Sequence, residues 1–172
     1  FYAGGSNSVR GFEGNTVGPR DIQRIRTSIN VPGPIPGAGN TTVYLPEEFD
    51  RIAVSRYSIG GNAKAINTFE LIFPTPFLED SSNVRTSIFV DAGNVWDTEF
   101  DQSRFEGLQI DPNSVLGDVP DFGDATNYRA SYGISLQWYS PFAPLQFSLS
   151  RPLKNEPYDD TETFTFTIGK TF

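Results

Sequence analysis

One arginine and two carboxylates have the residue types and the placement to join distant parts of this chain by charge. Arg10 lies in the segment Val9-Arg10-Gly11-Phe12, which further glycines flank on both sides. Glu70 and Asp91 each lie in a stretch where polar and apolar residues alternate. A guanidinium can bond a carboxylate through two parallel N–H groups. The spacing therefore predicts a glycine-hinged loop whose arginine is held by acids on neighbouring strands.

The residues needed for most covalent chemistry are missing. The chain has no His and no Cys, which removes the usual general base, thiolate nucleophiles and hydrolase triads. The acidic segment 97–127 includes Asp111, Asp118, Asp121 and Asp124, but it lacks the regular ligand spacing of a calcium loop. A solvated surface loop explains this segment better than a metal site does. We expect no enzyme activity, no cofactor and no metal.

Five runs of period-two alternation must position the charged residues: 61–73, 84–96, 128–138, 145–150 and 164–172. The last run is the clearest case, because Phe164, Phe166, Ile168 and Phe172 oppose a row of threonines and Gly169. A large apolar face opposite small hydroxyls suits a strand with lipid on one side and a hydrated interior on the other. The longer runs reach the roughly 9–11 residues that a tilted strand needs to cross a bilayer.

The connections predict how these strands are arranged. Residues 140–144 form a tight turn and 74–83 a moderately short one, whereas 97–127 and 1–59 are long. Short turns on one side and long loops on the other are typical of outer-membrane barrels. The sequence predicts an all-β fold: five antiparallel strands at the carboxyl-terminal end of a transmembrane β-barrel, with a long loop inserted into its lumen. Residues 1–59 form the loop region and residues 60–172 the strands, and the last strand ends at the periplasmic boundary.

Five strands cannot close a barrel, since small barrels need about eight. An open edge in hydrocarbon leaves backbone groups without hydrogen bonds, so further strands must come from the same polypeptide or from another copy. We expect a piece of a longer exported polypeptide, the alternative being a mature secreted protein trimmed at Phe1. The net charge of -8 disfavours nucleic acid or an anionic membrane surface as the main partner.

Two of these motifs resemble the BamA family, the central subunits of the machinery that assembles outer-membrane β-barrels. Val9 to Phe12 match the Val-Arg-Gly-Phe motif of the family's sixth extracellular loop. Phe89, Asp91 and Gly93 match its partner motif, Phe-x-Asp-x-Gly. The resemblance covers nearly the whole chain and keeps the order of the motifs. Segments 21–58 and 101–127 do not match the family's sequence pattern, so we assign no family role to them. Further matching segments are 60–63, Glu70, 74–77, 95–98, 136–138, 140–141 and 168–172.

The resemblance implies a sixteen-stranded barrel behind periplasmic POTRA domains, of which this chain supplies loop six and the last five strands. It implies insertion of β-barrel proteins into the outer membrane of Gram-negative bacteria, with no nucleotide and no cofactor. The loops would be extracellular and the carboxyl terminus periplasmic. The implied partners are the rest of the barrel, the POTRA domains, the Bam lipoproteins that bind outside this chain, unfolded outer-membrane proteins and the lipid bilayer.

Three groups of candidate site residues follow. The first is the loop-six motif, and the second is the set of lumen partners that hold it; ordinary polarity of a barrel interior is the alternative for both. The third is the seam along the terminal strand, where Gly169 weakens pairing or permits a close backbone approach. Phe172 is either a membrane-boundary aromatic or a terminal recognition signal. The groups are Val9, Arg10, Gly11 and Phe12; Glu70, Phe89, Asp91 and Gly93; and Phe164, Phe166, Ile168, Gly169 and Phe172.

Two other functions stay open on the sequence alone. A two-partner-secretion-type pore would share the loop and partner motifs but would export one dedicated substrate. A plain outer-membrane channel or receptor would conduct ions or take up a ligand without upstream POTRA domains.

Overall fold

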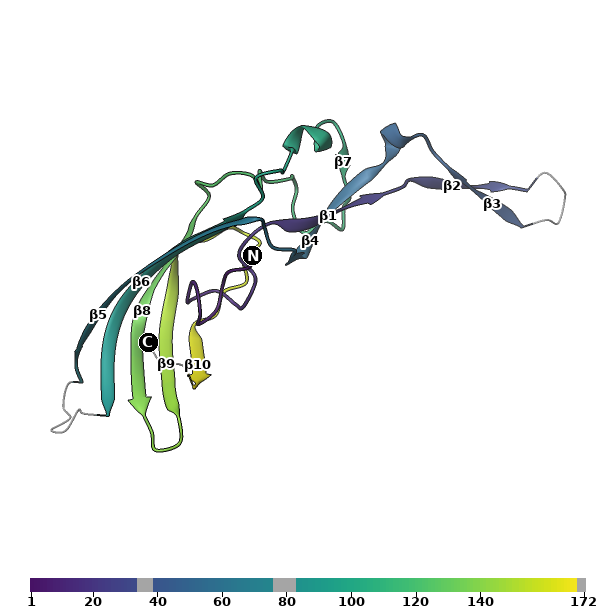
Figure 1. The fold of residues 1–172 in the computed structure, drawn as a ribbon. Helices are drawn as coiled ribbons and strands as arrows, with labels where there is room; N and C mark the ends of the chain where they lie inside the picture. The colour runs from purple at the N-terminus through teal and green to yellow at the C-terminus, as the bar shows by residue number, and fades with distance from the viewer. Residues whose placement is uncertain (34–38, 76–82, 170–172) are drawn as a thin grey trace.

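Five antiparallel strands form one curved sheet in the computed structural model, which describes residues 1–33, 39–75 and 83–169 (Figure 1). In spatial order the sheet is β10-β9-β8-β6-β5. The strands are β5 (Ala63–Pro74), β6 (Val84–Trp96), β8 (Arg129–Tyr139), β9 (Pro144–Lys154) and β10 (Phe164–Ile168). The prediction of an all-β fold with five antiparallel strands is confirmed. β9 continues four residues beyond the predicted run, and β10 ends at Ile168; Phe172 lies outside the described residues.

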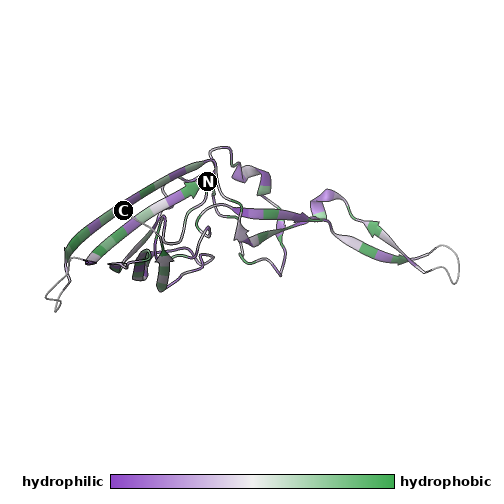
Figure 2. Cartoon of the chain, turned by 60° about the horizontal axis from the view of Figure 1, so that its bottom comes forward, coloured by the Kyte–Doolittle hydropathy of each residue, from purple (hydrophilic) through white to green (hydrophobic). Residues whose placement is uncertain are grey.

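The two faces of the sheet differ as the alternation predicts. Ile88, Ile134 and Leu149 are about half exposed on the outer face, and bands of opposite hydropathy alternate along the strands in Figure 2. The inner face carries small polar residues, where the Ser135 and Ser148 hydroxyl oxygens lie 3.1 Å apart. Each residue points opposite to its neighbour in a strand, so this sequence yields one apolar and one polar face.

Both edges of the sheet are open in the part of the chain that the structure describes. β5 pairs only with β6, and β10 pairs only with β9, over five residues from Phe164↔Leu149 to Ile168↔Leu145. Exposed backbone groups at these edges require further strands if the outer face meets lipid.

The described residues of segment 21–58, which are 21–33 and 39–58, form not an irregular loop but a long two-stranded arm that projects from the sheet (Figure 1). β1 (Arg20–Ile25) pairs with β4 (Arg51–Ser58), and further out β2 (Ser28–Pro32) pairs with β3 (Asn40–Tyr44). A 3₁₀ turn, η1 (Glu47–Phe49), precedes β4. These strands could not be predicted from the sequence, because most of their residues are exposed and no apolar face marks them.

The acidic segment 97–127 shares a small core with the arm and with Tyr158. η2 (Gln102–Phe105) is a 3₁₀ turn, and β7 (Gln109–Ile110) pairs in parallel with β4 of the arm. No helix in the described ranges is long and apolar enough to cross a membrane. The expected solvated loop is therefore folded, because scattered apolar residues converge with two from the arm. The core consists of Ile52, Val54, Val119, Phe122 and Tyr158.

Candidate functional site

The amino-terminal segment 1–19 docks on the inner face of the sheet. Its ends are held together by a bridge between Ala3 and Val17, and Phe12 bridges to Thr161, just before β10. Val9 and Phe12 are fully buried. They form an apolar core with Ala3, Val17 and Val95, against which Ile66 of β5 packs. Hydrophobic burial thus fixes the segment on both sides of Arg10.

Arg10 meets Asp91 with the two-pronged geometry that the sequence predicted. Its Nε donates to Oδ2 at 2.7 Å and its Nη2 to Oδ1 at 2.9 Å. The backbone N–H of Arg10 also donates to Oδ2, at 3.1 Å. Arg10 is 4% exposed and Asp91 0%, so water does not screen the pair. Because Asp91 lies on β6, this contact ties the loop to an interior strand of the sheet.

Two further side chains contact the guanidinium, and a third contacts the Arg10 backbone. Nη1 lies 3.5 Å from Oε1 of Glu70, whose carboxylate also accepts a hydrogen bond from Ser87. The guanidinium carbon stacks 3.4 Å from the centre of the Phe89 ring. Ser131 of β8 donates its hydroxyl to the Arg10 carbonyl. We call Arg10, Asp91 and Glu70 the Arg10 cluster; its formal charge is +1 − 2 = −1.

Two glycines of the motifs are required by geometry. Gly11 has φ +91°, a conformation that side-chain-bearing residues rarely adopt, and a Cβ there would lie 3.1 Å from the Ser131 Cβ. A Cβ on Gly93 would lie 2.7 Å from Cγ2 of Val9, so a larger residue would press against the docked loop. Sequence reasoning missed Gly133, which leaves room for the Phe89 ring on the neighbouring strand.

The described seam residues lie apart from Arg10 but are linked to its loop through the backbone. Phe164, Phe166 and Ile168 are about half exposed on the outer face. Gly169 ends β10 with φ +81° and donates its N–H to the Pro144 carbonyl at 2.8 Å. In the segment leading to β10, the N–H of Glu162 donates to the Gly11 carbonyl at 3.1 Å, and that of Glu13 donates to the Asp160 carbonyl at 2.9 Å.

A second buried charge cluster was not anticipated from the sequence. Arg129 donates to both carboxylate oxygens of Asp159, at 2.8 and 3.2 Å, and Nη2 of Arg20 lies 3.7 Å from the same carboxylate. Tyr158 Oη accepts a hydrogen bond from Arg129 at 3.0 Å. We call these four residues the Asp159 cluster; its formal charge is +2 − 1 = +1. Asp159 falls in an irregular connection, so no periodic pattern pointed to it.

Backbone carbonyls supply much of the Asp159 cluster. Arg20 donates to the carbonyls of Thr16 at 2.7 Å, Tyr158 at 2.8 Å and Arg56. Burial lowers the pKa of the Arg20 guanidinium, while the Asp159 charge opposes that shift. Burial also raises the pKa of the Tyr158 phenol, against the opposing charge of Arg129.

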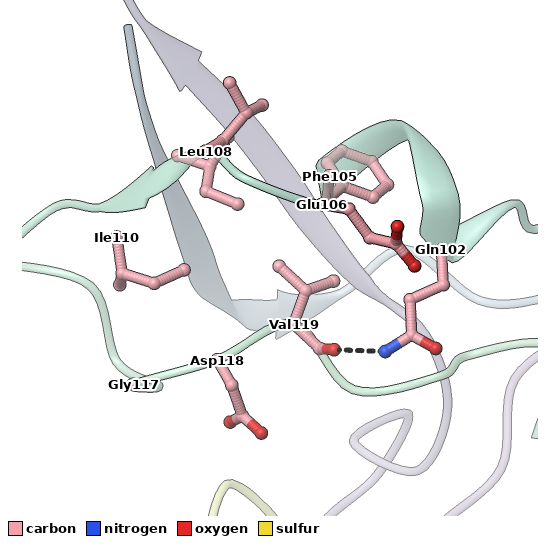
Figure 3. A pocket seen from close by; sticks show the side chains of 9 residues that line it. Gln102, Phe105, Glu106, Leu108, Ile110, Gly117, Asp118 and Val119 are labelled. Carbon is pink, nitrogen blue, oxygen red and sulfur yellow. Dashed lines mark hydrogen bonds between the residues drawn. The ribbon is translucent and has the colours of Figure 1, made fainter. Parts of the chain in front are cut away.

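The acidic segment and β4 line an open cavity of about 390 Å³ beside η2 and β7 (Figure 3). Phe105, Leu108, Ile110 and Val119 line it, and Gln102 Nε2 donates to the Val119 carbonyl at 3.0 Å across one side. Within the described ranges no three acidic residues gather closely enough to hold a metal ion. Nothing at this cavity connects to the Arg10 cluster.

A sheet with one apolar face, one serine-lined face and a loop fixed by charge on the polar side defines a segment of an outer-membrane β-barrel wall. Comparison with known proteins agrees. A model of the Omp85 superfamily domain matches residues 1–172, and the chain belongs to that family.

The proteins similar to this chain include two BamA proteins. The outer membrane protein assembly factor BamA of Neisseria meningitidis serogroup B is 34% identical over 175 aligned residues, which include all of this chain and 18% of that protein. The crystal structure of Haemophilus ducreyi BamA lacking POTRA domains 1–3 superposes with a TM-score of 0.69 at 39% identity. That match covers 96% of this chain and 26% of the other. The chain thus spans about a fifth to a quarter of these relatives, and it matches their barrel region.

Proposed function

We propose that this chain forms the carboxyl-terminal wall of a barrel that assembles and inserts β-barrel proteins into the bacterial outer membrane. Residues 1–59 act as extracellular loop six and residues 60–172 as the last five strands. The loops face the outside and the carboxyl terminus the periplasm. The rest of the barrel, POTRA domains, Bam lipoproteins and unfolded outer-membrane proteins are its partners. The action needs no covalent chemistry and no cofactor.

The observation that carries this proposal is the buried contact between Arg10 and Asp91. An arginine sequestered from water, bonded twice to one carboxylate and stacked on Phe89, holds a loop in one position. The same loop is hydrogen-bonded to the segment that leads into β10, so its position also sets where the terminal strand begins.

The short pairing of β10 supports a role at the seam. Among the described residues, which end at Gly169, β10 is paired over five residues, whereas β8 and β9 are paired over ten. The positive φ of Gly169 ends the strand, and a weakly paired edge is a template for an incoming strand. Phe164, Phe166 and Ile168 then form the lipid-facing side of that template, and Phe172 would lie at the periplasmic boundary.

The test uses the full-length protein reconstituted in liposomes, with Arg10→Ala and Asp91→Ala variants. Both variants should assemble added β-barrel substrates more slowly, because the loop loses its charged anchor. Heat-modifiable migration on gels reports whether each variant's own barrel is folded. Unchanged assembly and unchanged migration in both variants would refute the role of the Arg10 cluster. Export of a single dedicated substrate, in place of assembly of several, would instead favour a secretion pore.

A charge-neutral variant separates loop docking from electrostatics. Gly93→Ala places a methyl group against Val9 and should displace the loop while Arg10 and Asp91 both remain. Adding Val9→Ala makes room for that methyl group and should restore part of the assembly rate. Equal rates for Gly93→Ala and the double variant would contradict the docking model.

A further inference from the structure

The outer face of β9 carries two positive charges near one end of the strand. The register shifts by one residue here, so that Lys154 pairs with Ala130 and Arg151 with Tyr132. This bulge brings Arg151 and Lys154 to the same side of the sheet, where simple alternation would separate them. Consistent with this, the Lys154 Nζ lies 4.1 Å from the centre of the Tyr128 ring.

An apolar groove of about 560 Å³ lies beside Arg151 on the same face. Ile88, Tyr132, Ile134 and Leu149 line it together with Arg151. These apolar side chains are about half exposed, as expected for a surface that meets acyl chains. Arg151 is exposed and forms no ion pair or hydrogen bond through its side chain with any residue in the described ranges. Its charge is free to bind a ligand at the end of the groove.

The strand direction gives the depth of this site. β9 starts at Pro144, directly after the tight turn, and ends at Lys154. In the orientation of the proposed function, on which this step rests, the tight turn is periplasmic, so Arg151 and Lys154 lie at the extracellular boundary of the bilayer. Tyr128 and Tyr132 lie at the same level, where aromatic residues gather at a membrane–water interface.

We propose that Arg151, Lys154 and this groove bind a phosphorylated glycolipid of the extracellular leaflet. Its phosphate sits between the guanidinium and the ammonium, and one acyl chain lies along Ile134 and Leu149. Arginine suits phosphate because its fork donates two parallel hydrogen bonds. A long side chain at this depth also keeps its apolar stem in the hydrocarbon and its charged end at the surface.

The overall charge of the chain does not oppose this site. Much of the net charge of -8 comes from segment 97–127, which holds eight acids against one Arg104. Two acids lie near the cations: Glu162, two residues before the Phe164↔Leu149 pair as Arg151 is two residues after it, and Asp124, which interacts electrostatically with Lys154. Neither forms an ion pair with them. The eight acids are Asp97, Glu99, Asp101, Glu106, Asp111, Asp118, Asp121 and Asp124.

Native mass spectrometry of the full-length protein in detergent tests the site, with lipid A as the probe and dephosphorylated lipid A and phosphatidylglycerol as comparisons. Arg151→Gln and Lys154→Gln should each weaken lipid A binding about fivefold, because each removes one charge-assisted contact to phosphate. Glu162→Gln, which removes a repulsive charge, should strengthen it. The matched control is Arg85→Gln, since Arg85 lies near the other end of the sheet and stacks on Tyr139.

Three results would overturn the inference: wild-type affinity in the Arg151→Gln/Lys154→Gln double variant, equal loss in the Arg85→Gln control, or equal binding of dephosphorylated lipid A. Tighter binding of phosphatidylglycerol than of lipid A would replace the glycolipid with a phospholipid and would also overturn it. Assembly activity is measured on the same preparations. Phosphate-dependent binding without assembly would refute only the proposed function, and assembly without phosphate-dependent binding would refute only this inference.

Discussion

The Arg10 cluster and the Asp159 cluster both hold buried arginines, but different groups compensate the buried positive charge in each. Arg10 depends on a carboxylate from the middle of a regular strand, and its only hydrogen-bond acceptor among the described side chains is Asp91. Arg20 and Arg129 share one carboxylate from an irregular connection, and backbone carbonyls accept further hydrogen bonds from both. Each cluster keeps one buried guanidinium nitrogen without a hydrogen-bond partner among the described residues, Nη1 of Arg10 and Nε of Arg20. The first cluster has an excess of negative charge and the second an excess of positive charge.

This difference predicts how strongly a side-chain substitution destabilises each cluster. Removal of one partner from a desolvated pair leaves a charge without compensation, which costs more than the pair itself contributes. Backbone carbonyls cannot be removed by substitution, so an arginine bonded to them keeps part of its environment in any side-chain variant. The Arg10 cluster should therefore be the more fragile of the two.

The largest effect is expected for Asp91→Ala. Arg10 would stay buried without its only carboxylate at hydrogen-bond distance, and the free energy of unfolding should fall by about 3–5 kcal/mol. Denaturant titration of the full-length barrel, followed by heat-modifiable migration, measures this. In the double variant Arg10→Ala/Asp91→Ala the loss should be smaller than the sum of the single losses. Strict additivity would show that the two side chains do not interact.

Asp159→Asn should destabilise less, by about 1–3 kcal/mol. Arg20 keeps three carbonyl acceptors, and Arg129 keeps the Asn127 carbonyl and the Tyr158 hydroxyl. The same titration measures the loss. If Asp159→Asn proved more damaging than Asp91→Ala, the backbone carbonyls would not be the protection that we infer.

Glu70→Gln should cost about 1 kcal/mol or less. Its carboxylate is 17% exposed, lies 3.5 Å from Arg10 and already accepts a hydrogen bond from Ser87, which a glutamine oxygen can keep. Comparing the free energies of unfolding of this variant and of Asp91→Ala shows how much each acid stabilises Arg10. A loss as large as that of Asp91→Ala would mean that both acids neutralise Arg10 equally.

The smallest effect is a pH dependence confined to the Asp159 cluster. Burial raises the pKa of Tyr158 in the folded state, so the folded protein holds this proton more tightly than the unfolded chain does. The corresponding stability is complete below the unfolded pKa of about 10 and is lost as pH rises towards the folded value. Tyr158→Phe should lose less stability between pH 9 and pH 11 than the wild type. Identical alkaline losses would contradict this assignment.

The sheet could be predicted because it follows from periodicity, whereas the Arg10 cluster could be predicted because periodicity and the resemblance of two motifs to a known family agree. Alternation placed Glu70, Phe89 and Asp91 on one face of adjacent strands, and a single arginine in a glycine-rich segment was the natural partner for the acids. The close approach at Gly93 also agrees with its place in the motif. In this region the alternation along each strand and the observed contacts between strands and loop agree.

The arm, the folded acidic segment and the Asp159 cluster could not be predicted in this way. β1 and β4 are paired strands that carry few buried residues outside Ile52 and Val54, so their sequences resemble exposed loops. Tyr158 and Asp159 lie between β9 and β10 in a connection without a period. Their roles arise from which distant segments meet there, and that information is not local to any stretch of sequence.

Arg10 is separated from Asp91 by 81 residues and from Ser131 by 121, so its contacts span most of the chain. Contacts between positions so far apart form slowly, because the intervening chain must first lose its freedom. The docking surface for the loop does not exist until β6 and β8 lie side by side. Loop docking should therefore be a late folding event, and it would distinguish a completed barrel wall from one whose strands are still being added.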